Sequence, residues 1–204
     1  DWFGKSIALD NDTIAVGAIH ESSNQTTITN GTSASSDNSK YRSGAVYVYK
    51  RTGTTWAQEA YIKAANSDSW GSGDQFGYSV SLSGDTLAVG ANFEDSNQNT
   101  ITNGTSASSN NDNGDSGAVY IYKRTGSTWA QEAYIKAANN DNKDEFGSFV
   151  SLGENMLAVG AIYESSNQTT ITNGTSASSD NSNNKAGAVY VYRRIGTTWA
   201  QAAY

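Results

Sequence analysis

The chain has 204 residues, a formal net charge of −7, no proline and no cysteine. Without cysteine, disulfides and thiolate metal sites are excluded, so packing and backbone pairing must stabilise the fold. The negative charge argues against nucleic acid or an anionic membrane surface as a partner, because both select basic patches. Apolar runs are strand-sized, so we expect no membrane insertion.

One pattern occurs three times at an interval of about 70 residues. Each copy opens with Phe-Gly, continues to Val-Gly-Ala, and ends near a tryptophan. A fixed period indicates one structural unit used repeatedly. The predicted units are residues 1–66, 67–138 and 139–204.

Within the second unit, residues 79–82 alternate polar and apolar side chains, as expected of a short strand. Ser83-Gly84-Asp85 is typical of a turn, because glycine tolerates positive φ and aspartate can bond its own backbone. Residues 86–89 then predict a second strand. The other copies place Asp10–Asp12 and Gly153–Asn155 at the same turn, so a hairpin is predicted in each unit.

Residues 117–123 predict a third strand, and residues 129–136, rich in β-formers and aromatics, predict a fourth. Ala118, Tyr120 and Tyr122 should face one side, with Val119 and Ile121 on the other. Because both faces carry bulky groups, both must be covered. We therefore predict an all-β array of three four-stranded antiparallel blades, as in a β-propeller.

The motifs Phe3-Gly4, Val16-Gly17-Ala18, residues 43–49 (Ser-Gly-Ala-Val-Tyr-Val-Tyr) and residues 52–56 (Thr-Gly-Thr-Thr-Trp) carry a family resemblance. Together they resemble the FG-GAP repeats of bacterial surface proteins, which are similar to the blades of the integrin α-subunit propeller. The resemblance implies an extracellular or cell-surface location. It is specific for fold and weak for function, because one fold hosts many functions.

A long polar segment, residues 21–43, separates the second and third strands of the first unit. Residues 26–29 and 32–35 flank Asn30-Gly31, which favours a type I′ hairpin. Asn103-Gly104 and Asn173-Gly174 repeat the signal, so we expect a two-stranded arm projecting from each blade. The near identity of the arms fits either a shared contact or recent duplication.

Six Asn-x-Ser/Thr sequons, five of them in the predicted arms, are candidate glycosylation sites. They are Asn11, Asn24, Asn30, Asn103, Asn167 and Asn173. We expect some arms to carry N-linked or O-linked sugar.

Aspartate-rich and asparagine-rich stretches recur before the Phe-Gly and Gly-Ala-Val motifs. Ca²⁺ binds several oxygen ligands on a tight loop, and the integrin resemblance implies calcium in loops of this kind. The candidate ligands are Asp68, Asp74, Asp112, Asp115, Asp141 and Asp144. None lies in a complete Asp-x-Asp-x-Asp-Gly motif, so solvated turns are the alternative.

The residues predict no catalytic set. His20 is the single histidine, and its equivalents Phe93 and Tyr163 indicate an aromatic structural position. Glu21, Glu94 and Glu164 recur once per unit, which favours a structural role over acid–base catalysis. We expect a non-enzyme, with a glycan-active enzyme as a distant alternative.

Three blades cannot close a ring, since propellers have about four to eight. Bare terminal sheets should be covered by neighbouring chains or by a longer parent chain. We therefore expect a non-catalytic extracellular structural or adhesive protein that self-assembles into a ring or filament. The alternative is a calcium-dependent module, similar to the integrin head, whose partner is a glycan or a surface receptor.

Overall fold

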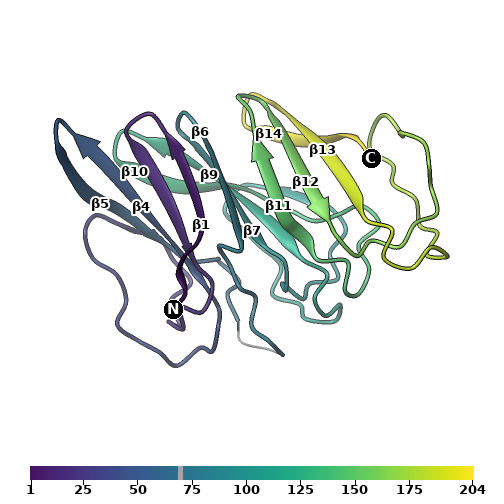
Figure 1. Ribbon diagram of the computed structural model, residues 1–204, viewed down its shortest axis with the longest axis horizontal. Coiled ribbons are helices and arrows are strands. Elements are labelled where there is room, and N and C mark those ends of the chain that lie inside the picture. Colours follow the sequence, from purple (N-terminus) through teal and green to yellow (C-terminus); the bar gives the residue numbers. More distant parts are fainter. Residues whose placement is uncertain (69–70) are drawn as a thin grey trace.

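The computed structural model describes residues 1–68 and 71–204, and it is all-β. Three antiparallel sheets stand side by side along the long axis of the molecule (Figure 1). The first has the order β1 (Phe3–Asp10), β2 (Thr13–Ala18), β4 (Ala45–Thr52), β5 (Thr55–Ile62) and β3 (Thr29–Asn30). The second has the order β6 (Ser79–Ser83), β7 (Thr86–Ala91), β9 (Ala118–Thr125), β10 (Thr128–Ile135) and β8 (Ile101–Asn103). The third has the order β11 (Phe146–Leu152), β12 (Met156–Ala161), β13 (Ala188–Ile195) and β14 (Thr198–Ala203).

The predicted propeller-like blade array is confirmed. Each blade is a meander of four strands whose first hairpin turns where glycine, asparagine and aspartate gather, as at Asn11 (φ 51°) and Gly84 (φ 56°). In the part of the chain that the structure describes, no helix has the length and hydrophobicity needed to cross a membrane.

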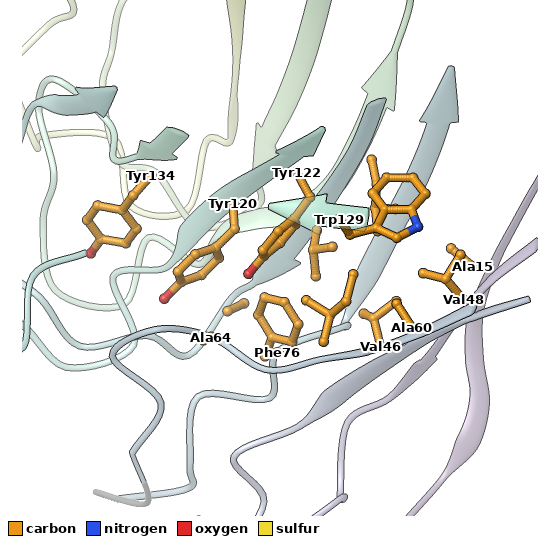
Figure 2. Close-up of a cluster of buried hydrophobic side chains, with 14 of the residues drawn as sticks. Ala15, Val46, Val48, Ala60, Ala64, Phe76, Tyr120, Tyr122, Trp129 and Tyr134 are labelled. Carbon is orange, nitrogen blue, oxygen red and sulfur yellow. The ribbon is translucent and has the colours of Figure 1, made fainter. Parts of the chain in front are cut away.

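The described residues form two apolar cores, each between neighbouring blades. The first joins Val46, Val48 and Ala60 of the first blade to Phe76, Tyr120 and Trp129 of the second (Figure 2). The second core joins the second and third blades. Ala118, Tyr120 and Tyr122 face the first core and Val119 and Ile121 the second, as the alternation predicted.

The glycines of the repeated motifs meet where blades pack. A Cβ on Gly17 would lie 2.1 Å from the carbonyl oxygen of Gly77, and one on Gly90 would lie 2.1 Å from that of Gly147. Such distances are far inside van der Waals contact, so a side chain at either position would push the blades apart. The Phe-Gly of one blade therefore packs against the Val-Gly-Ala of the blade before it.

The predicted two-stranded arms are wrong. Thr29–Asn30 pairs with β5, and Ile101–Asn103 pairs with β10, each as the outermost strand of its own blade. Gly31 has a φ of 113°, but Asn30 does not have a positive φ, which a type I′ turn requires at both central residues. These segments return to the sheet and extend it.

Candidate functional site

Each blade boundary is held by a glutamate of the earlier blade. Glu59 accepts hydrogen bonds from the Trp129 indole Nε1 (2.9 Å) and from Arg124 Nη1 (3.2 Å). Glu132 accepts the same pair of bonds from Trp199 and Arg194, at 2.9 and 3.2 Å. Both carboxylates are largely buried, so these charge-assisted bonds fix the spacing of the blades.

An asparagine adds a second inter-blade contact. The Asn30 side chain accepts from the Trp129 backbone N–H at 2.7 Å and donates to the Trp129 carbonyl at 3.3 Å. Asn103 binds Trp199 in the same way, at 2.8 and 3.3 Å. The amide thus substitutes for a strand partner. In Asn30 and Asn103 the nitrogen that would carry an N-linked glycan donates to the next blade.

A serine and a threonine complete the boundary. Ser6 Oγ donates to the Gly77 carbonyl at 2.7 Å, and Thr13 Oγ1 accepts from Arg124 Nη1 at 3.2 Å. At the next boundary Ser79 and Thr86 make the equivalent bonds, at 2.7 and 3.4 Å. The outer faces of the first two blades therefore carry a polar set that binds the next blade, beside the apolar residues of the shared cores.

The third blade lacks this polar set. Phe149, Met156 and Ala202 stand where the earlier blades have serine, threonine and glutamate. The side chains of Phe149 (67% exposed), Met156 (44%) and Val189 (58%) are uncovered. They adjoin a hollow of about 570 Å³. The residues that line this hollow, among them Phe149 and Val189, are all uncharged. The outer face of this blade is apolar.

An acidic cluster lies in the second blade. Carboxylate oxygens of Asp68, Asp74 and Asp95 lie within 4.8 Å of one another. Asp68 and Asp74 come from the segment before Phe76, and Asp95 follows β7. Asp74 and Asp95 are buried. The structure thus brings together two predicted ligands and a third, Asp95, that the sequence reasoning missed.

Burial perturbs these carboxyls. It raises the pKa of Asp74 well above the ordinary value, with added repulsion from Asp68 and Glu94. It also raises the pKa of Asp95 to about 6, opposed by a hydrogen bond from the Asp115 backbone N–H. Each group is easier to bury neutral than charged.

The third blade has a related but incomplete arrangement. The Asp141 backbone N–H donates to Asp144 at 3.1 Å, as the Asp68 N–H does to Asp74 at 3.0 Å. The equivalent of Asp95 is Ser165, which lines a small hollow with Asp141 and Asp144. Burial, then repulsion from Asp141 and Glu164, raise the pKa of Asp144 to about 7.

The other two predicted ligands lie apart from this cluster. Asp112 accepts from the side chains of Asn97 and Asn110 in an exposed loop. Asp115 reaches the cluster through its backbone N–H, and it is not among the grouped carboxylates of the described chain.

The remaining sequons, like Asn30 and Asn103, lie at the surface. Asn24, Asn167 and Asn173 are exposed. Asn11 occupies the first hairpin turn, where its side chain donates to Asp10.

The recurrent glutamates and the histidine have structural contacts. Glu21 binds the buried ammonium group of Lys63 at 2.7 Å, and Glu94 binds Lys136 at the same distance. His20 stacks on Trp2 with ring centroids 4.2 Å apart. Burial and nearby positive charge lower the pKa of His20. Glu21, Glu94 and His20 therefore all have partners within the fold.

Comparison with known proteins supports this geometry. No match was found among curated protein sequences. The profile of the FG-GAP repeat matches residues 1–49, 56–122 and 129–192, and the second and third matches begin in β5 and β10 of the preceding blade. The glycines that meet between blades belong to the motifs that name the repeat. The chain belongs to the FG-GAP repeat family.

Proposed function

We propose that this protein is a non-catalytic extracellular structural or adhesive module that self-associates through the outer face of its third blade. FG-GAP repeats are typically extracellular, propeller-type modules and are generally non-enzymatic. The proposal adds to this family character a specific contact surface and a partner, which is a second copy of the chain.

The observation that carries the proposal is the apolar outer face of the third blade. Its Phe149, Met156 and Val189 are exposed, whereas the corresponding faces of the first two blades are covered. Burying one such side chain contributes about 1.5–3 kcal/mol. A large uncovered apolar face is typical of an interaction surface.

A first blade of another copy fits this face poorly. At the two internal boundaries, Ser6 Oγ and Ser79 Oγ each lie 2.7 Å from a glycine carbonyl oxygen of the next blade. Phe149 stands at the same position in the third blade, so its ring would overlap the backbone of a first blade docked there. Arg51 and Trp56 of the incoming blade would also find Ala202 in place of their glutamate acceptor. These mismatches oppose the head-to-tail contact that a ring or filament of copies requires.

A second third-blade face fits better. The hollow beside Phe149 and Val189 has no charged lining, so two copies can meet across a two-fold axis without like-charge repulsion. We therefore propose a dimer that buries both third-blade faces and leaves both first blades outward.

Sedimentation equilibrium over a range of concentrations tests this contact. The wild type should form a reversible dimer, and Phe149→Ser with Met156→Thr should weaken it at least about tenfold. These substitutions restore the residues of the first two blades. The matched control is Ile7→Ser in β1. Ile7 is exposed and lies in the first blade, outside the proposed interface, so this substitution should leave dimerisation unchanged. A wild-type monomer at high concentration would refute the proposal, and micrographs showing rings or filaments would favour the head-to-tail alternative.

We also propose that the polar loops carry sugar in a host that glycosylates exported proteins. Asn24, Asn167 and Asn173 are exposed. Asn30 and Asn103 are exposed as well, but their amide nitrogens donate to the next blade. Peptide mass spectrometry should find glycan at one or more of the first three. Full occupancy at Asn30 or Asn103 would contradict the inter-blade role of those amides.

A further inference from the structure

We infer that Arg51 and Trp56 form a carboxylate-binding site on the first blade, whose ligand is a glutamate on the sheet face of another polypeptide. Arg51 of β4 pairs in register with Trp56 of β5. Arg124 and Trp129 occupy the same positions in the second blade, where they donate to Glu59 of the preceding blade at 3.2 and 2.9 Å. The internal boundary therefore shows which ligand this pair of side chains binds.

The pair is already arranged for binding in the uncovered first blade. Arg51 Cζ lies 5.8 Å from the centre of the Trp56 ring, against 5.4 Å for the equivalent pair of the second blade. Asp12 accepts from Arg51 Nε and Nη2 at 2.8 and 2.6 Å, and Asp85 accepts from the same two atoms of Arg124 at the same distances. A site whose side chains are fixed before binding loses less conformational entropy when its ligand arrives.

Two N–H donors of the pair are unused. In the second blade, Arg124 Nη1 and the indole Nε1 beside it donate to the glutamate. Within residues 1–68 and 71–204, neither Arg51 Nη1 nor Trp56 Nε1 has an acceptor. The Arg51 side chain is 47% exposed, against 10% for Arg124. Both donors are therefore available to one carboxylate, in the charge-assisted arrangement seen at the internal boundaries.

An apolar surface adjoins these donors. Phe3, Ile7 and Leu9 of β1 are 55%, 65% and 65% exposed, whereas their counterparts in the second blade pack in the first core. The rings of Phe3 and Tyr47 lie 5.4 Å apart, and the equivalent rings of the second blade lie 5.2 Å apart. A small free anion would satisfy the donors and leave this surface exposed. The ligand that fits both features is a glutamate set in an apolar sheet face.

The backbone of the first blade has the docking geometry as well. Gly4 has a φ of 92°, against 91° for Gly77 and 90° for Gly147, which both pack against a preceding blade. A Cβ on Gly4 would meet no heavy atom of the described residues within 4 Å, so the space in front of it is open to a partner. The Gly77 carbonyl accepts from Ser6 of the preceding blade. The partner of the first blade should likewise present a hydroxyl group to the Gly4 carbonyl.

A second wild-type copy does not offer this ligand. On its third blade, Ala202 replaces the glutamate, and Phe149 and Met156 replace the serine and threonine, whereas Asn173 and Gly160 are retained. The partner is therefore a different polypeptide, with a sheet face that carries serine, threonine and glutamate as the first two blades do. This site is independent of the proposed dimer, which uses the other end of the chain.

A variant of this chain supplies the probe. Phe149→Ser, Met156→Thr and Ala202→Glu together give the third blade the polar set of the first two blades. The double variant without Ala202→Glu is the matched control. In sedimentation velocity, the triple variant should associate head to tail at least about tenfold more tightly than the double variant. Adding Arg51→Ala or Trp56→Phe should reverse this gain, and Arg51→Lys should reverse it only in part, because lysine retains the charge without the planar fork.

Two outcomes would overturn the inference. One is a folded triple variant, checked by circular dichroism, that associates no more tightly than the double variant. The other is association that Arg51→Ala and Trp56→Phe leave unchanged, because the glutamate would then bind elsewhere. Arg51 and Trp56 lie outside the proposed dimer contact, so these comparisons remain decisive even if that dimer does not form.

Discussion

Replacing Gly90 by alanine should separate the second and third blades. Gly90 is in β7, and an added Cβ would lie 2.1 Å from the Gly147 carbonyl oxygen and 2.4 Å from Ser79 Oγ. Overpacking of this kind costs about 1–3 kcal/mol, and loss of the Ser79 to Gly147 hydrogen bond adds about 1 kcal/mol. The expected destabilisation is therefore about 2–4 kcal/mol.

The third blade provides the matched control. Gly160 occupies the same motif position, but an added Cβ would meet no heavy atom closer than 3.6 Å, at Phe149. Neither Gly90 nor Gly160 has a positive φ, so alanine is not strained by the backbone at either site. Gly160→Ala should be neutral or should stabilise by up to about 1 kcal/mol, through reduced freedom of the unfolded chain.

Thermal and urea unfolding of both variants decides the matter. At about 2–4 °C per kcal/mol for a chain of this size, Gly90→Ala should lower Tm by roughly 5–15 °C, while Gly160→Ala should leave Tm level or slightly raised. Equal shifts in the two variants would refute the idea that the motif glycine is required by the neighbouring blade.

The remaining predictions concern charge. Glu132→Ala should destabilise by about 2–3 kcal/mol in urea unfolding, because the largely buried Arg194 loses its carboxylate partner; an effect below about 0.5 kcal/mol would contradict the inter-blade role of that glutamate. Asp144 has a pKa of about 7 in the folded chain, against about 3.9 when unfolded. Folding therefore favours its protonated form, and its contribution to stability is complete below about pH 4 and lost as the pH rises through 7. Asp144→Asn should reduce the pH dependence of the urea concentration at the unfolding midpoint in that window. An unchanged pH dependence would show that this carboxyl is not the titrating group.

The strands and their faces could be predicted from the sequence, because alternation and a regular period report directly on a pleated sheet. Tyr120 and Val119 lie in different cores, as their alternation requires. The arms could not be predicted in the same way. Asn30-Gly31 is a strong local turn signal, but the edge of β5 and the Trp129 backbone of the next blade compete for the same residues. Such tertiary bonds have no local signature.

The acidic cluster was only partly predictable for a related reason. Asp68 and Asp74 lie in one segment and were found as candidates. Asp95 comes from another loop, and its equivalents in the other units are Ser22 and Ser165, so the repeat comparison hid it. Proximity between two loops depends on how β7 and the segment before Phe76 are placed, which pattern reading does not determine.

Both the sequence and the structure are needed to recognise the apolar outer face of the third blade. Compared one by one, Phe149, Met156 and Ala202 are ordinary differences between copies. The structure shows that the equivalent residues in the earlier blades all bind the following blade, two of them through the same arginine. Removing the glutamate would take one carboxylate partner from a largely buried arginine, so the polar residues act together as a set. Their joint replacement by apolar groups means that a blade like the second or third cannot dock there with the same bonds. The dimer that we propose would instead cover this face through apolar contact with a second copy of itself.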